Sequence, residues 1–166
     1  VTLLSEEGNV LGTATADSNG NFSITPTSNL ADNNYSLTVK AVDAAGNTST
    51  TSSPISLTVD TVTSTPSALA TASPLTNNPA PAITGTAEAG STVTLLSEEG
   101  NVLGTATADS NGNFSITPTS NLADNNYSLT VKAVDAAGNT STTSSPISLT
   151  VDTVTSTPSA LATASP

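Results

Sequence analysis

The side chains of this sequence that could carry chemistry are almost all carboxylates and amides. The chain has 13 Asp and Glu residues against two Lys, no His, Cys, Met or Trp, and a net charge of −11. Without His and Cys, most zinc sites, most nucleophile–base pairs and any disulfide framework are excluded. Calcium, in contrast, takes about six to eight oxygen ligands from carboxylates, amides, backbone and water. Oxygen-based binding of a hard cation is therefore the chemistry to look for.

Four carboxylates stand in or beside turn sequences. Asp109 opens the run DSNGN, Asp135 opens DAAGN, Glu88 precedes Ala-Gly, and Asp60 follows the alternating segment ISLTV that ends at residue 59. These are also ordinary turn sequences, in which Asp and Asn accept hydrogen bonds from nearby backbone. Taken singly, each is explained better by turn chemistry than by metal binding, so a metal site depends on whether the fold brings them together.

Alternation of apolar and polar residues predicts the strands that must position these groups. Tyr127, Leu129, Val131 and Ala133 should face a core, with Tyr127 placed to form a tyrosine corner by bonding backbone a few residues upstream. Gly- and Asn-containing turns separate the strands, and no stretch has the apolar period of a helix. Seven strands are expected in one module, at 67–71, 82–88, 92–97, 102–108, 114–117, 127–133 and 147–151.

An internal repeat sets the domain organisation. Residues 1–74 recur unchanged as residues 93–166, which gives a period of 92 residues. This period is too long for a solenoid repeat and suits one immunoglobulin-like β-sandwich per repeat. We predict a partial module at 1–60 whose first strands lie outside this sequence, a complete module at 61–152, and the start of a third at 153–166, with a strand at 159–163. The fold class is all-β, as tandem sandwiches of about seven antiparallel strands.

The order of these strands predicts that the four carboxylates converge. In a seven-strand sandwich, the loops at 88–90, 109–113 and 135–139 lie at the end where the chain enters the module. The preceding module's last strand ends at Asp60 and points at the same end. We therefore predict a calcium site at the module junction, built from Asp60, Glu88, Asp109 and Asp135. Asp124 is expected only to cap its turn.

Four motifs resemble bacterial Ig-like repeats of the stalks of biofilm-associated and giant RTX-type surface adhesins. They are ITGTAEAGSTVTLL (83–96), LGTATADSNGNFSITP (103–118), LADNNYSLTVKAVDAAGNTS (122–141) and ISLTVDTVTSTPSA (147–160). The resemblance implies a stalk or spacer on the bacterial cell surface, where calcium stiffens junctions between identical modules and another region binds the target. The junction reads Asp60-Thr61-Val62 where the family more often has Asp-Thr-Thr-Ala-Pro, and acidic residues are fewer than in many calcium-rich relatives. These departures imply fewer calcium ions per module, or none at some junctions.

Other functions find little support in the composition. Net negative charge disfavours nucleic acid and anionic membranes, and no apolar run reaches the roughly 20 residues that span a bilayer. Lys132 falls on the outer face of its strand, which argues against a Ser–Lys dyad, and we predict no enzymatic activity. Aromatic residues are too few for a typical sugar-binding platform. The alternative function is a self-associating module of an extracellular fibre, because Lys-poor edge strands can pair between sister chains.

Overall fold

A computed structural model describes residues 1–159, and all regular structure in this range is strand. The chain divides into two compact units, Val1–Thr61 and Val62–Pro166. The described residues contain no helix that could cross a membrane. The strand expected at 159–163 lies, from residue 160 onward, outside the described residues. The all-β prediction is confirmed, and each unit is considered by itself below.

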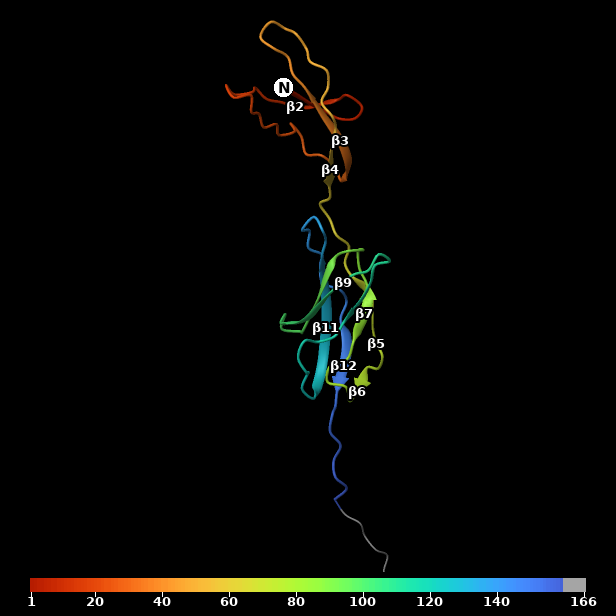
Figure 1. Ribbon diagram of the computed structural model, residues 1–166. Coiled ribbons are helices and arrows are strands. Elements are labelled where there is room, and N and C mark those ends of the chain that lie inside the picture. The colour runs from red at the N-terminus through yellow and green to blue at the C-terminus, as the bar shows by residue number, and fades with distance from the viewer. Residues whose placement is uncertain (160–166) are drawn as a thin grey trace, which may run out of the picture. The chain divides into compact units, whose positions relative to one another are not determined.

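The second unit contains all seven expected strands and one that was not expected. The expected strands agree with the alternation pattern to within a few residues at their ends (Figure 1). The extra strand, β6 (Leu75–Thr76), covers two residues and pairs in parallel with the last strand. The remaining strands are β5 (Ser67–Thr71), β7 (Ile83–Thr86), β8 (Thr92–Leu96), β9 (Val102–Thr107), β10 (Asn113–Ile116), β11 (Asn125–Val134) and β12 (Ile147–Val151).

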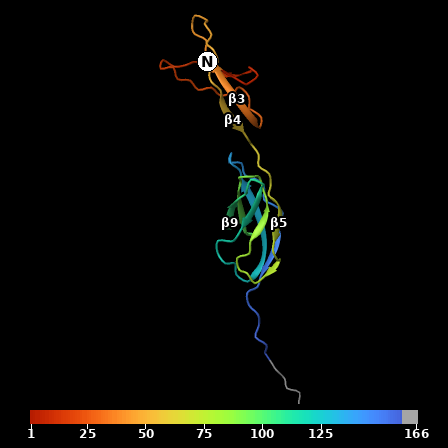
Figure 2. The same ribbon diagram turned by 45° about the vertical axis from the view of Figure 1, so that its right-hand side comes forward.

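These strands form two sheets in the second unit. One sheet has the order β10-β7-β5 and the other has the order β6-β12-β11-β8-β9. Figure 2 shows β5 and β9, which belong to different sheets, on opposite sides of the unit. Every pairing is antiparallel except that of β6 with β12. The segment after residue 62 therefore adds a strand to each sheet: β5 pairs with β7 in the first sheet, and β6 pairs with β12 in the second.

The core of the second unit lies between the two sheets and follows the predicted alternation. Leu129, Val131 and Ala133 have no exposed surface, and Tyr127 packs against the same cluster. The Tyr127 hydroxyl donates to the Ala123 carbonyl oxygen at 2.9 Å, which confirms the tyrosine corner. The other sheet contributes Phe114, whose ring lies against the backbone of Gly85. A Cβ at Gly85 would approach the Phe114 Cζ to 2.7 Å, so this contact requires glycine.

The first unit is a single sheet built from part of the same sequence. Its strands are β1 (Thr2–Leu4), β2 (Val10–Thr13), β3 (Asn33–Lys40) and β4 (Ile55–Val59), in the order β2-β1-β3-β4. They correspond to β8, β9, β11 and β12 of the second unit. Strands equivalent to β5, β6 and β7 are absent from the described part of this unit, and residues 21–24, equivalent to β10, form no strand. Only Leu3, Leu4 and Leu37 are buried apolar residues here.

Candidate metal site

Asp109 and Asp135 occupy equivalent turns and use their carboxylates in the same way. In each turn, Oδ1 accepts the backbone N–H four residues later, from Asn113 or Asn139, at 2.8 Å. The side-chain amide of the same Asn donates to Oδ2, at 3.4 Å for Asn113 and 2.8 Å for Asn139. The turns close at a glycine with positive φ, Gly112 or Gly138. Local sequence therefore builds both turns, as the conventional turn interpretation expects.

The two turns differ in burial. Asp109 is exposed, whereas Asp135 is only 8% exposed. Burial acts to raise the pKa of Asp135, but hydrogen bonds from the Asn139 side chain and backbone outweigh it, so this pKa lies below the ordinary value of 3.8. The backbone N–H of Asn113 similarly lowers the pKa of Asp109. Both carboxylates are therefore held in the charged form that binds cations.

Three of the four predicted carboxylates form an acidic cluster that could hold a metal ion. One oxygen each from Asp60, Glu88 and Asp135 lies within 4.8 Å of the others. Asp60 follows β4 directly, Glu88 follows β7, and Asp135 follows β11. Asp60 and Glu88 are half-buried and Asp135 is buried.

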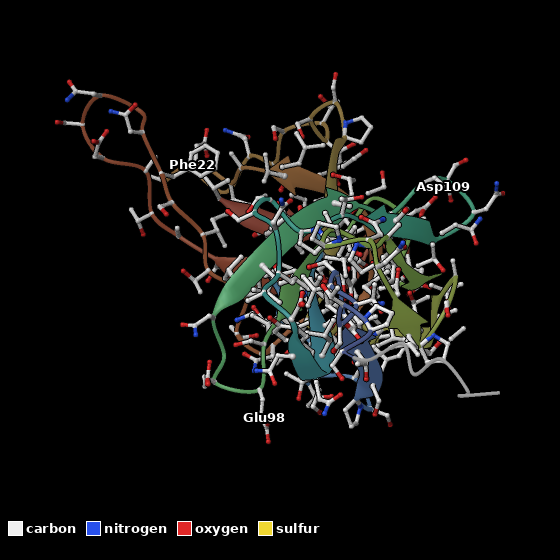
Figure 3. All side chains as sticks on the ribbon, turned by 90° about the horizontal axis from the view of Figure 1, so that it is seen from below. Phe22, Glu98 and Asp109 are labelled. Carbon is white, nitrogen blue, oxygen red and sulfur yellow. The ribbon has the colours of Figure 1, made fainter. Side chains whose placement is uncertain are left out.

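Asp109 is not among the residues of this cluster. Its carboxylate accepts the N–H groups of Asn111 and Asn113 on the loop between β9 and β10. Figure 3 shows Asp109 on this loop, separate from the β8–β9 hairpin that carries Glu98. The role of Asp109 as a ligand therefore stays a prediction, with its carboxylate oxygens already engaged in the turn.

The chemistry of the cluster suits a hard cation. All three groups are carboxylates, and the whole sequence offers only Lys40 and Lys132 as cationic side chains. Three like charges at this separation repel one another, and a bound divalent cation would remove that repulsion. One converging oxygen from each carboxylate makes three ligands, so the rest of the six to eight that calcium takes would come from the second carboxylate oxygens, backbone, amides or water.

Thr hydroxyl groups form hydrogen bonds near Glu88 that the sequence analysis did not predict. Thr63 donates its hydroxyl to Glu88 Oε2 at 2.9 Å, and the hydroxyls of Thr65 and Thr142 bond each other at 2.5 Å. The segment entering the second unit is therefore attached to it before β5 begins. Thr residues at alternate positions 61, 63 and 65 were the available signal, but their partners lie far away in the sequence.

Asp124 has a larger role than capping its own turn. Its Oδ1 accepts both the backbone N–H of Thr153 at 3.1 Å and the Thr153 hydroxyl at 2.7 Å. In the first unit, Asp32 Oδ1 accepts the Thr61 hydroxyl at 2.8 Å in the same way. In each copy, an Asp side chain therefore holds the segment that follows the last strand by hydrogen bonds. The turn sequence around Asp124 did not predict this role.

Comparison with known protein families identifies the type of module. The model of a family described as bacterial Ig-like domain matches residues 1–61 and 63–153. No curated protein sequence matches the chain significantly.

Several solved structures are similar to this chain over part of their length. The BSP domain of a biofilm-associated protein is 27% identical, with a TM-score of 0.43, over 93% of this chain and 25% of that one. A tetra-tandem repeat from the extending region of a large adhesion protein is 22% identical, with a TM-score of 0.46, over 92% and 41%. A 1.5-MDa bacterial ice-binding adhesin is 28% identical, with a TM-score of 0.35, over 90% and 51%. The chain thus spans between a quarter and about half of these structures.

Proposed function

The chain belongs to the bacterial Ig-like domain family, and we propose that it is a stalk repeat of a bacterial cell-surface adhesin whose module junctions are stiffened by calcium. In this proposal the repeats extend a distal binding region away from the cell for adhesion or biofilm formation. The single observation that carries the proposal is the exact repetition of 74 residues with a period of 92, because residues 62–151, within one such period, hold a complete two-sheet core.

The path of the chain through the second unit supports a role in extension. β5 and β12 begin at the same end of the unit, and the chain leaves beyond Val151 at the opposite end (Figure 1). A module with its entry and exit at opposite ends can be joined to further copies without doubling back. Its core is formed within residues 83–151, so each module can be stable without sharing a core with its neighbours.

The acidic cluster supports the calcium part of the proposal. Asp60 belongs to the segment that follows the first copy's last strand, whereas Glu88 and Asp135 belong to loops of the complete module. A cation held by all three would restrict the connecting segment. It would also stabilise the folded module, because it binds the native state and not the unfolded chain.

Thermal unfolding of the chain in about 2 mM calcium and then in EGTA tests this proposal. Extracellular calcium modules have dissociation constants of about 10⁻⁴–10⁻³ M, so this concentration should stabilise the second unit by roughly 0.6–1.8 kcal/mol. Small-angle scattering on the same samples should give a longer and less variable particle with calcium than with EGTA. Identical melting and identical length in both buffers would contradict calcium stiffening.

Matched variants locate the effect. Glu88→Gln removes a charge from the cluster but keeps an oxygen that can accept from Thr63, so the calcium response should fall while the calcium-free stability changes little. Glu98→Gln removes the same charge from the exposed β8–β9 hairpin and should leave the calcium response intact. A full response in Glu88→Gln, or its loss in Glu98→Gln, would place the ion elsewhere.

A further inference from the structure

The shortest strand of the second unit joins the segment that enters the module to the strand that leaves it. β6 covers two residues, and its pairing with β12 is parallel, whereas the other described pairings of this unit are antiparallel. The Thr150 N–H donates to the Pro74 carbonyl oxygen at 2.7 Å. The Asp152 N–H donates to the Thr76 carbonyl oxygen at 3.0 Å. β6 is therefore bonded to the residues with which the chain leaves the module.

The direction of these strands decides how a pull on the module would strain this pairing. β5 and β12 both begin at the entry end of the unit, and the chain leaves at the opposite, exit end (Figure 1). A pull between the two ends draws β6 toward the entry end, because β6 follows the entering segment, and draws β12 toward the exit end. Since the two strands are parallel, they would have to slide along each other. Sliding strains their hydrogen bonds together, whereas a sideways pull breaks such bonds one after another.

The loop at 122–124 holds the same end of the module together. The Leu122 N–H donates to the Pro79 carbonyl oxygen at 2.7 Å, shortly after β6. On the same loop, Asp124 Oδ1 accepts the N–H and the hydroxyl of Thr153, just beyond β12. The loop therefore connects the segment after β6 with the segment after β12. Tension applied at the exit end reaches the β6 region both through β12 and through this loop.

The attachments at the entry end are less regular. The entering segment is bonded through side chains, with the Thr63 hydroxyl donating to Glu88 and the Thr65 hydroxyl bonded to that of Thr142. The pairing of β5 with β7 has an irregular register, and Ala68 within β5 has a positive φ of 53°. Such a backbone conformation is unfavourable for a residue other than glycine. Under tension the entering segment and β5 would therefore detach first, and the pairing of β6 with β12 would then bear the pull.

We propose that Pro74–Thr76 and Thr150–Asp152 form a mechanical clamp that keeps the module folded when the chain is pulled along its length. The biological role of this clamp rests on the stalk function proposed above, because a stalk transmits tension through every module. The clamp itself is made of main-chain hydrogen bonds and requires no calcium. Survival under tension depends on the rate of unfolding under force and not on the equilibrium free energy of unfolding.

Single-molecule force spectroscopy on the full chain tests the clamp by changing the direction of the pull. The chain has no cysteine, so pairs of introduced cysteines can serve as handles at exposed positions. Val62→Cys with Val154→Cys pulls along the strands of the second unit. Leu75→Cys with Val102→Cys pulls across its five-stranded sheet, from β6 at one edge to β9 at the other. Unfolding along the strands should require at least about twice the force needed across them, and equal forces would overturn the proposal.

A matched pair of substitutions tests the hydrogen bonds of the clamp. Asp152 is exposed and follows β12, so Asp152→Pro removes the N–H that donates to Thr76 without placing proline inside the strand. Asp152→Ala removes the same carboxylate but keeps this N–H. Pulled along the strands, the Pro variant should unfold about fivefold faster than the Ala variant, as expected for the loss of one hydrogen bond that resists the pull. Identical rates would contradict the clamp.

Both force experiments are run in EGTA, which separates them from the calcium proposal. The handles lie within residues 62–154, so only the second unit is under tension. A clamp that fails these tests would leave the effect of calcium on melting and particle length unchanged. A clamp that passes them would stand even if calcium had no effect on either.

Discussion

The two units of this chain place one sequence in two structural contexts. In both, residues that bond over short distances do so identically: Tyr35 and Tyr127 each donate to a carbonyl four residues earlier at 2.9 Å. What differs is burial, since Phe114 is enclosed and Phe22 is not. The difference arises from β5–β7, because the described residues include these strands for the second unit alone. Local bonding and core formation are therefore separable in this fold.

Substituting Ala for the two equivalent Phe residues should give the largest difference between the copies in the free energy of unfolding that is lost. Phe114→Ala leaves a cavity in the core and should cost about 3–5 kcal/mol of the free energy of unfolding of the second unit. Phe22→Ala removes a half-exposed ring and should cost the first unit less than about 1 kcal/mol. Urea unfolding of the full chain measures both values. Equal costs at the two positions would show that the contexts do not differ as described.

Removing a buried hydroxyl should give the next largest difference. Ser144 Oγ accepts the Val131 N–H at 3.0 Å inside the core. Ser144→Ala leaves that N–H without its partner and should cost about 1–3 kcal/mol. Ser52 Oγ accepts the equivalent Val39 N–H at 3.1 Å in an exposed setting, where water can replace it. Ser52→Ala should therefore lower the free energy of unfolding of the first unit by less than about 0.5 kcal/mol. Urea unfolding of the two variants, with the midpoint of each compared with that of the unsubstituted chain, measures both losses.

The tyrosine corner should behave alike in both copies. Tyr127→Phe removes the hydrogen bond to the Ala123 carbonyl, and Tyr35→Phe removes the bond to the Ala31 carbonyl. Each is a single neutral hydrogen bond at an exposed site, worth about 0.5–1.5 kcal/mol. Matching losses of this size in the two units would support the separation of local bonding from burial. A loss confined to the second unit would show instead that the corner depends on the closed core.

Acid should weaken both units slightly through their equivalent turns. In the folded chain, hydrogen bonds lower the pKa of Asp17, Asp43, Asp109 and Asp135 below 3.8. A lowered folded-state pKa contributes stability above the unfolded value, and this contribution is lost as the pH falls through 3.8 towards the folded value. Melting temperatures measured between about pH 6 and pH 3 should fall only over the lower part of this range. Asp109→Asn should reduce the slope for the second unit.

Much of the fold could be predicted because strand signals are local. The alternation at 127–133 gave the correct inner face, and the position of Tyr127 gave the corner. The two-residue strand β6 could not be predicted, since it depends on the backbone edge of β12 and not on its own side chains. The absence of a strand at 21–24 also has no local cause, because the identical residues 113–116 form one when β7 is beside them.

The candidate metal site likewise has features that the sequence predicted and features that it did not. The turns of Asp109 and Asp135 could be recognised from their sequences, and the strand order suggested which loops share an end. The grouping of Asp60 with Glu88 and Asp135, without Asp109, could not be predicted, because it depends on the tertiary structure. Nor could the attachment of Thr153 to Asp124, because these residues are 29 positions apart and neither has an unusual neighbour.

The sequence by itself determined the bonds that close within a few residues: the Asp–Asn turns, the tyrosine corners and the alternation of the strands. These form in both copies because both partners are always present nearby. Only the tertiary structure decided which apolar residues are buried and which carboxylates meet. Burial and convergence need partners tens of residues away, and residues 62–91 supply them to one copy of the sequence and not to the other.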